Sequence, residues 1–169
     1  MACTLAILLT YSSTFPKIKT KTSPQEKAKP KENSISRSDR GDGSGVSVFV
    51  LDTGIRYTHV EFGQRAKFFY DAFNDGYNGN DCTGHGTHSA DTIGGNTVGV
   101  APGVTLYSCR VFDCNDRGRS SGTVGAMDAV AASGIRQAVV SMSLGSGFSR
   151  VMNNAVNLTD SLTPDTPSS

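Results

Sequence analysis

Short apolar runs alternate along the chain with segments of helix-compatible composition. The run Val46–Leu51 is apolar at nearly every position and ends at an Asp-Thr-Gly turn, a pattern typical of a strand buried on both faces. An alternation of such strands with helices predicts an α/β fold with a parallel sheet. The other predicted strands are Ala66–Tyr70, Thr105–Val111 and Ala138–Ser143, and the predicted helices are His85–Ile93 and Ser121–Ala132.

The segments on either side of this pattern have little to bury. Residues 1–15 have an apolar centre with no basic residue before it, which is typical either of a weak secretory signal or of a frayed tail. Residues 16–40 consist largely of Lys, Ser, Thr and Pro and predict a linker. A last short helix is expected over Val151–Leu158, and residues 159–169 predict a disordered tail. The folded domain is therefore expected over residues 41–158.

Charge is divided unevenly between the linker and the folded domain. Residues 1–40 carry eight basic and three acidic residues, a net charge of +5, whereas the remainder carries eight basic and twelve acidic residues, a net charge of −4. Basic residues in such a linker are typical of a solvated tail, so the sequence gives no reason to expect nucleic acid binding. No apolar run approaches the roughly 20 residues needed to span a bilayer.

A carboxylate follows the first predicted strand. Asp52 lies at the carboxyl end of that strand, where parallel α/β proteins place their functional sites. An ionised carboxylate at a buried strand end needs a cation or hydrogen-bond donors beside it. The alternative interpretation is a turn aspartate that caps its own Asp-Thr-Gly loop.

The sequence Gly-His-Gly-Thr-His over residues 84–88 makes a functional interpretation of Asp52 more specific. Two flanking glycines let backbone and substrate approach His85 closely, at the entrance of a predicted helix. There it can act as a general base if a carboxylate fixes its tautomer. His88 lies inside the predicted helix, where a structural role is favoured. The spacing is not that of His-Glu-x-x-His, which disfavours a zinc site.

Five motifs occur in the order Val48–Ile55, Thr58–Phe62, Gly84–His88, Gly99–Pro102 and Ser141–Gly145. In this order they resemble the subtilisin-like serine proteases, and the similarity is greatest to the proteinase K and aqualysin branch. The resemblance covers about residues 41–158 and implies a subtilisin-like fold, a polypeptide substrate and a secreted protein. It implies that Asp52 is the aspartate of a catalytic triad and His85 its base, in the subtilisin order of Asp before His.

The resemblance also implies two segments that contact the substrate. Ser143-Leu144-Gly145 matches the segment that pairs with an extended peptide, and Asp116-Arg117-Gly118 occupies the place of the opposite strand. Such pairing needs small residues with free backbone N–H and C=O groups. Asp116 and Arg117 replace the usual Gly and Ser, which makes this edge more polar and bulkier.

The cysteines admit two interpretations. Aqualysin-like enzymes join the positions that match Cys82 and Cys114, so the resemblance implies a disulfide between them. The alternative is a pair of free thiols in a cytosolic protein. Cys109 is expected to be a buried core thiol. Calcium is common in the family, but the short connection Gly94–Val98 lacks the loop that builds one of its sites, so no metal or cofactor is expected here.

Two parts of the subtilisin mechanism have no counterpart in these 169 residues. The serine of a Gly-Thr-Ser-Met-Ala-x-Pro segment and the asparagine of the oxyanion site are both missing. The pair Ser141-Met142 lacks the required flanking residues. The segment Gly118–Gly122 matches Gly-x-Ser-x-Gly, but that motif needs a histidine after the serine.

We therefore interpret the chain as a truncated catalytic domain that is inactive alone. The strand that would follow Ala138–Ser143 is absent, which predicts an exposed apolar sheet edge there. Two other functions stay open. One is a non-catalytic fragment that binds a peptide or partner along Ser143–Gly145. The other is an aspartic protease that uses the Asp52-Thr53-Gly54 loop, although this needs a second such loop and leaves the His cluster unexplained.

Overall fold

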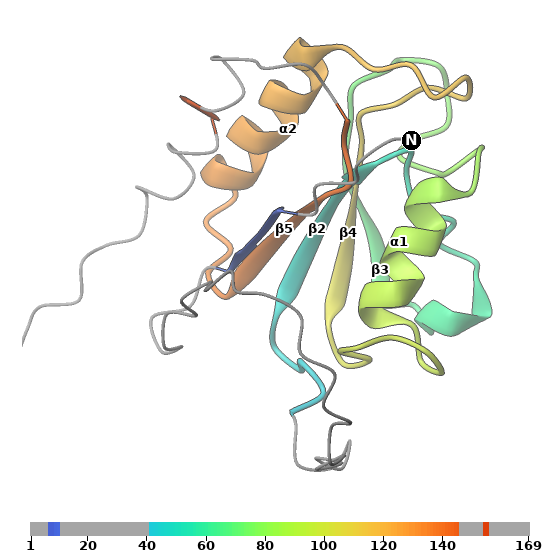
Figure 1. The fold of residues 1–169 in the computed structure, drawn as a ribbon, viewed down its shortest axis with the longest axis vertical. Coiled ribbons are helices and arrows are strands. Elements are labelled where there is room, and N and C mark those ends of the chain that lie inside the picture. The colour runs from blue at the N-terminus through green and yellow to red at the C-terminus, as the bar shows by residue number, and fades with distance from the viewer. Residues whose placement is uncertain (1–6, 11–40, 146–153, 156–169) are drawn as a thin grey trace, which may run out of the picture.

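The computed structural model describes residues 7–10, 41–145 and 154–155 (Figure 1). The four predicted strands and both long predicted helices are confirmed, with ends that differ by one residue. The predicted helix Val151–Leu158 lies outside the described residues except for Asn154 and Ala155, which are helical. In chain order the elements are β1 (Ile7–Thr10), β2 (Ser47–Asp52), the 3-10 turn η2 (Val60–Phe62), β3 (Ala66–Asp71), α1 (His85–Gly94), β4 (Thr105–Arg110), α2 (Ser120–Ala132) and β5 (Ala138–Met142).

The strands form one sheet in the order β1-β5-β2-β4-β3. The central strand β2 pairs in parallel with β4 and β5, and β3 pairs in parallel with β4. Asp52 lies opposite Arg110, and Leu51 lies opposite Met142, so the three strands β2, β4 and β5 end nearly level. Figure 1 shows both α1 and α2 beginning at this upper end of the sheet. The parallel α/β fold therefore gathers the loops that follow the strands at one edge.

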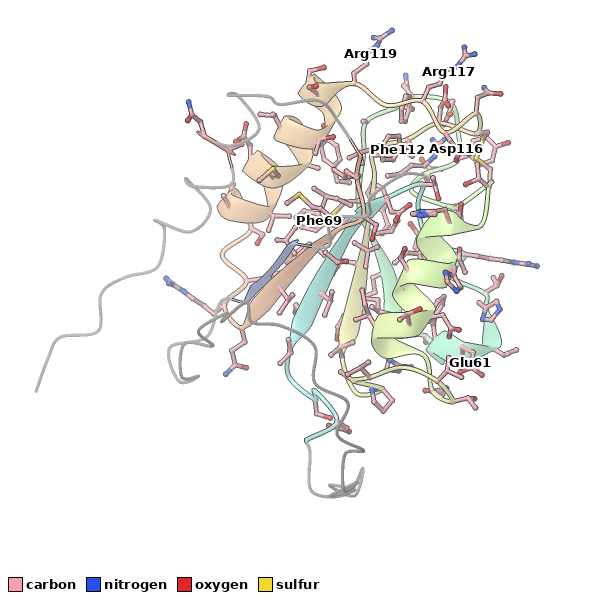
Figure 2. All side chains as sticks on the ribbon, in the orientation of Figure 1. Glu61, Phe69, Phe112, Asp116, Arg117 and Arg119 are labelled. Carbon is pink, nitrogen blue, oxygen red and sulfur yellow. A yellow bond between two sulfur atoms is a disulfide. The ribbon has the colours of Figure 1, made fainter. Side chains whose placement is uncertain are left out.

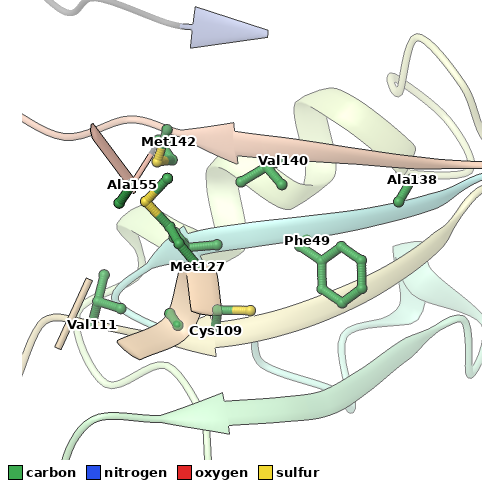
Figure 3. Close-up of a cluster of buried hydrophobic side chains, with 10 residues drawn as sticks. Phe49, Cys109, Val111, Met127, Ala138, Val140, Met142 and Ala155 are labelled. Carbon is green, nitrogen blue, oxygen red and sulfur yellow. The ribbon is translucent and has the colours of Figure 1, made fainter. Parts of the chain in front are cut away.

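The two helices cover opposite faces of the sheet, because successive side chains of β2 point to opposite sides. Phe49 and Leu51 lie in a buried cluster with Met127 of α2 (Figure 3), whereas Val48 and Val50 lie in a second cluster with α1. The face of α1 that meets the sheet consists of small residues, namely Gly86, Ala90 and Gly94. None of the described helices is long and apolar enough to cross a membrane.

Strand β1 corrects one expectation from the sequence. It pairs antiparallel with β5 from Ile7 opposite Met142 to Thr10 opposite Val139, so the edge that was expected to be exposed is covered along these pairs. The expectation was wrong because a segment that precedes the domain, residues 7–10, pairs with β5 in place of a strand after it. The free N–H and C=O groups of an edge strand can pair with any extended segment that the chain can bring to it.

Deletion of residues 1–15 should therefore cause association of the protein. Loss of β1 leaves the backbone groups of β5 unpaired, and such an edge pairs with other chains. Size-exclusion chromatography with light scattering should show dimers or larger species. Deletion of residues 16–30 removes the same length of chain but keeps β1 and should leave the oligomeric state of the parent protein unchanged. A monomeric protein after deletion of residues 1–15 would contradict the expectation.

Candidate active site

The structure brings the two predicted catalytic residues into contact. Asp52 is the last residue of β2 and His85 the first of α1, and His85 Nδ1 lies 2.7 Å from Asp52 Oδ1. The Asp52 side chain is only 1% exposed. Its carboxylate also accepts hydrogen bonds from the Thr53 backbone N–H at 2.7 Å and from Ser89 Oγ at 3.1 Å. These three donors satisfy the carboxylate that the sequence places at a buried strand end.

The two glycines around His85 make this contact possible. Gly84 has a φ of 101°, a left-handed conformation that favours glycine, and it turns the chain into α1. A Cβ on Gly86 would collide with the Gly54 carbonyl oxygen and would lie 3.1 Å from Asp52 Cβ. Only a residue without a side chain therefore lets the first turn of α1 approach the end of β2 this closely.

The environment of His85 favours its protonated form. The hydrogen bond from Nδ1 to Asp52 and the negative charge of that carboxylate raise the pKa of His85 above its ordinary value of 6.5, although partial burial opposes the shift. The charges of Asp116 and Asp81 act in the same direction. A carboxylate can only accept, so Nδ1 carries the proton of the neutral ring, and Nε2 has a lone pair in that form. Because the His85 side chain is 56% exposed, it is accessible as a general base.

The predicted disulfide between Cys82 and Cys114 is confirmed, with Cα atoms 5.4 Å apart. It joins the loop before His85 to the loop after β4. Cys109 is a buried free thiol, as predicted, and burial raises its pKa well above the ordinary value. The cross-link therefore fixes one of the predicted substrate segments beside the start of α1.

Asp116 lies at a tight turn in the structure, and Gly118 after it is part of an antiparallel bridge. Asp113 Oδ1 accepts the backbone N–H groups of Asn115 and Arg117, which closes the loop over its own side chain. Asp116 at the tip has a left-handed φ of 57°. Its carboxylate is close enough to His85 to help raise the pKa of that residue.

The remaining predicted substrate residues lie at the same end of the sheet. Gly118 forms an antiparallel bridge with Phe112, and Figure 2 shows the side chains of Arg117 and Arg119 extending outward from this loop. The segment Ser143–Gly145 directly follows β5, which is paired with β2. Its first two residues are partly buried and Gly145 is exposed.

Sequence analysis missed several polar residues that support the site. Ser89 and Thr53 bind the Asp52 carboxylate, and Asp81 accepts hydrogen bonds from the loop before His85. Arg110 is fully buried and pairs with Asp71 and Asp75. The order Asp81-Cys-Thr-Gly before a helix start is typical of an Asx turn, and this signal could have identified Asp81.

The carboxylates around the site have protein partners. Asp75 binds both terminal nitrogens of Arg110, at 2.8 and 2.9 Å, and Arg110 stacks on the rings of Phe73 and Tyr77. Among the described residues, no three His, Cys, Asp or Glu side chains are grouped so that they could hold a metal ion. That the site works without a metal or cofactor stays a prediction.

The chain is similar to known serine proteinases over most of its length. The sequence model of the subtilase family matches residues 43–168. An extracellular serine proteinase from Thermus sp. is 48% identical over 114 residues, which cover 68% of this chain and 28% of that protein. Proteinase T from Parengyodontium album is 41% identical over 122 residues, which cover 69% of this chain and 41% of that protein.

The fold is similar to that of a solved protease. The crystal structure of a cold adapted subtilisin-like serine proteinase superposes with a TM-score of 0.68 and 40% sequence identity, and the match covers 72% of this chain and 45% of that one. An alkaline serine exoprotease A from Vibrio alginolyticus is 45% identical over 115 residues, which cover 68% of this chain and 22% of that protein. The chain therefore spans less than half the length of these relatives.

Substitution Asp52→Asn should lower the pKa of His85 toward 6.5, because it removes the charge that most favours the protonated ring. A pKa raised by folding stabilises the native state fully at pH values below 6.5, and this contribution is lost as the pH rises through the folded pKa. Asp52→Asn should therefore lower the free energy of unfolding more at pH values below 6.5 than at pH values above the folded pKa of His85. NMR titration of His85 and denaturant unfolding at two pH values measure both effects.

The matched control is Asp128→Asn, which removes an exposed carboxylate from α2. It should leave the pKa of His85 unchanged. An unchanged pKa in Asp52→Asn would show that the 2.7 Å contact does not govern the protonation of the ring.

Removal of the disulfide should lower the free energy of unfolding by about 4 kcal/mol, the scale expected for a loop closed across 32 residues. The double substitution Cys82→Ala with Cys114→Ala tests this in guanidinium unfolding experiments. Cys109→Ala leaves the cross-link intact and serves as the control for loss of a thiol. An unfolding midpoint equal to that of the parent protein would contradict the expectation.

Proposed function

The chain belongs to the subtilase family, and from this premise we propose that residues 41–158 are the Asp- and His-bearing part of a serine endopeptidase. The observation that supports the proposal is the 2.7 Å contact between the buried Asp52 carboxylate and His85 Nδ1. The order of Asp before His along the chain is that of the subtilisin triad. The 2.7 Å contact also fixes the imidazole tautomer that such a triad requires.

In the proposed reaction, His85 Nε2 takes the proton of a serine hydroxyl while the serine oxygen attacks the carbonyl carbon of a peptide bond. Asp52 holds the ring in orientation and stabilises the imidazolium that forms. His85 then gives the proton to the departing amine. The negative charge on the former carbonyl oxygen needs hydrogen-bond donors aimed at it.

The 169 residues lack the serine of this reaction, because no Gly-Thr-Ser-Met-Ala segment occurs in the sequence. We therefore propose that the 169-residue chain does not form an acyl-enzyme by itself. Two relatives, of which this chain covers 28% and 22%, are named as a serine proteinase and a serine exoprotease. We propose that this chain has such an activity only as part of a complete triad.

The proposed substrate is a polypeptide that lies in extended form between Ser143–Gly145 and Asp116–Gly118. Both segments follow strands that end beside Asp52, which supports their role as the edges of a peptide site. We further propose that the protein is secreted. The disulfide between Cys82 and Cys114 suits an oxidising compartment, and the Thermus relative is named as extracellular. The proposal assigns no metal ion or cofactor to this chain.

The aspartic protease alternative is less well supported. That mechanism needs two carboxylates that share a proton. Among the described residues, the Asp52 carboxylate is bonded to His85, to Ser89 Oγ and to the Thr53 backbone N–H, none of which is a carboxylate. A fragment that binds peptides without cleaving them would use the same edges, so experiment must separate it from the protease.

The 169-residue protein should not react with a serine-directed fluorophosphonate probe and should not cleave casein, because it lacks the nucleophile. Sequencing of the transcript beyond the codon for Ser169 tests for an in-frame Gly-Thr-Ser-Met-Ala segment. The product that includes it should label and cleave casein. His85→Ala in that product should lower kcat by about 10⁶-fold and Asp52→Ala by about 10⁴-fold, the scale of such triads.

The control variant in the extended product is again Asp128→Asn, which should keep full activity. Labelling of the 169-residue protein that depends on His85 would contradict the claim that it has no nucleophile. Cleavage inhibited by pepstatin would favour the aspartic mechanism instead. An extended product that binds peptides but never labels would overturn the protease proposal in favour of a binding function.

A further inference from the structure

Asp81, in the loop before α1, accepts hydrogen bonds from both parts of the chain that carry the candidate pair. Its Oδ1 accepts from Thr53 Oγ1 at 2.9 Å, from the Thr83 backbone N–H at 3.0 Å and from the Gly84 backbone N–H at 2.9 Å. Its Oδ2 accepts from the Thr87 N–H at 2.9 Å and from Thr87 Oγ1 at 2.5 Å. The Asp81 carboxylate therefore accepts five hydrogen bonds, one from the turn after β2 and four from the start of α1 and the loop before it.

The contacts on the α1 side fix the backbone around His85. Gly84 immediately precedes His85, Thr87 follows it by two residues, and both donate their backbone N–H groups to Asp81. A helix start leaves its first N–H groups without intrahelical acceptors, and here the Asp81 carboxylate accepts some of them. The position and direction of His85 in the first turn of α1 therefore depend on this carboxylate.

The contacts on the β2 side lead directly to Asp52. Thr53 Oγ1 donates to Asp81 and accepts the Gly86 backbone N–H at 2.9 Å. The Thr53 backbone N–H donates at 2.7 Å to Asp52 Oδ1, which is the same oxygen that binds His85 Nδ1. The side chain of Thr53 is thus held between the turn after β2 and the start of α1.

A further contact ties the two segments at a second point. Thr87 Oγ1 donates to Asp81 and accepts the Arg56 backbone N–H at 3.0 Å. Arg56 lies in the same loop after β2 as Thr53. Rotation of the loop against α1 would therefore break hydrogen bonds at both hydroxyl groups.

Asp81 is suited to this role by its charge. It is half-buried, which opposes ionisation, but the hydrogen bonds from Thr87, Gly84 and Thr83 outweigh this effect and lower its pKa below the ordinary value of 3.8. Asp81 is therefore ionised at neutral pH, and hydrogen bonds to an ionised acceptor are about twice as strong as neutral ones. An amide in its place could accept at only one atom, so it could not replace both oxygens.

We propose that Asp81 is a positioning residue that sets the distance and direction between Asp52 and His85. It does so by holding the turn after β2 against the first turn of α1, without contact with substrate. Its importance for peptide hydrolysis rests on the proposed function. The geometry of the pair itself can be measured without any nucleophile.

The test is an NMR titration of the His85 ring in the full chain, with Asp81→Asn as the variant. Because the amide has one acceptor atom, the variant loses the hydrogen bonds that Asp81 accepts either from Thr53 or from Thr87, and either loss should loosen the pair. We expect the pKa of His85 to fall by about one unit, the scale of a lost contact with an opposite charge. The low-field resonance of the Nδ1 proton, which reports the hydrogen bond to Asp52, should broaden beyond detection.

The matched control is Asp116→Asn. The charge of Asp116 also raises the pKa of His85, and it contributes more to this than the charge of Asp81 does. No hydrogen bond from its side chain to either site loop is recorded within the described residues, so its removal changes charge alone. We expect a smaller fall in the pKa of His85 in this variant and a retained Nδ1 resonance.

Two substitutions at Thr53 test the hydrogen bond between Thr53 Oγ1 and Asp81 by changing its donor. Thr53→Val keeps the shape of the side chain but removes the hydroxyl, and it should reproduce the effect of Asp81→Asn on the Nδ1 resonance. Thr53→Ser keeps the hydroxyl and should retain the resonance and the pKa of the parent protein. Far-UV circular dichroism and mass determination of the disulfide establish that each variant is folded.

The proposal is overturned if folded Asp81→Asn keeps the Nδ1 resonance and shifts the pKa of His85 no more than Asp116→Asn. If Asp81→Asn does not fold, the two Thr53 variants decide. The proposal is then overturned if Thr53→Val keeps the Nδ1 resonance as Thr53→Ser does. Failure of the proposed function gives a different result. An extended product with native Asp81 would then lack fluorophosphonate labelling, whatever the titrations show.

Discussion

The candidate site depends on how closely the first turn of α1 approaches the turn that ends β2. Gly86 leaves no room for a side chain there, and its backbone N–H donates to Thr53 Oγ1 at 2.9 Å. This approach puts His85 Nδ1 2.7 Å from a carboxylate that is 1% exposed. If the helix were displaced by the space of one methyl group, Asp52 would lose its hydrogen bond with His85, and a buried carboxylate with fewer donors is costly. The contact between helix and turn therefore supports both stability and chemistry.

Two further constraints keep the surrounding loops in place. The disulfide between Cys82 and Cys114 ties the loop before α1 to the loop after β4. Beneath it, the buried guanidinium of Arg110 binds Asp71 and Asp75, and its Nη2 lies 3.7 Å from Cys114 Sγ. A buried ion pair adds little stability over an apolar core, but its loss leaves an unpaired charge. The pair therefore favours one arrangement of these loops over others.

Local and long-range features of this molecule differed in how well the sequence predicted them. The strand Ser47–Asp52 and the helix Ser120–Ala132 carry their signals within a single segment, so their patterns sufficed. The order of the motifs led to Asp52 and His85, and the structure brings them together. The turn at residues 113–118 was not foreseen, because it depends on which backbone N–H groups a single aspartate oxygen accepts. The pairing of β1 with β5 joins residues more than a hundred positions apart, and no local pattern specifies such a partner.

The raised pKa of His85 has opposite effects on the two halves of a proton transfer. It reduces the fraction of neutral imidazole near neutral pH, so fewer molecules carry a free base. It also stabilises the imidazolium that forms when a hydroxyl proton is taken, which lowers the barrier of the attacking step. The second effect dominates once the pH exceeds the folded pKa, because the ring is then neutral before the reaction and still gains its charge beside Asp52. An Asp–His pair with this geometry is therefore best suited to pH values above the folded pKa of His85, and each further carboxylate near the ring, such as Asp116, moves that range upward.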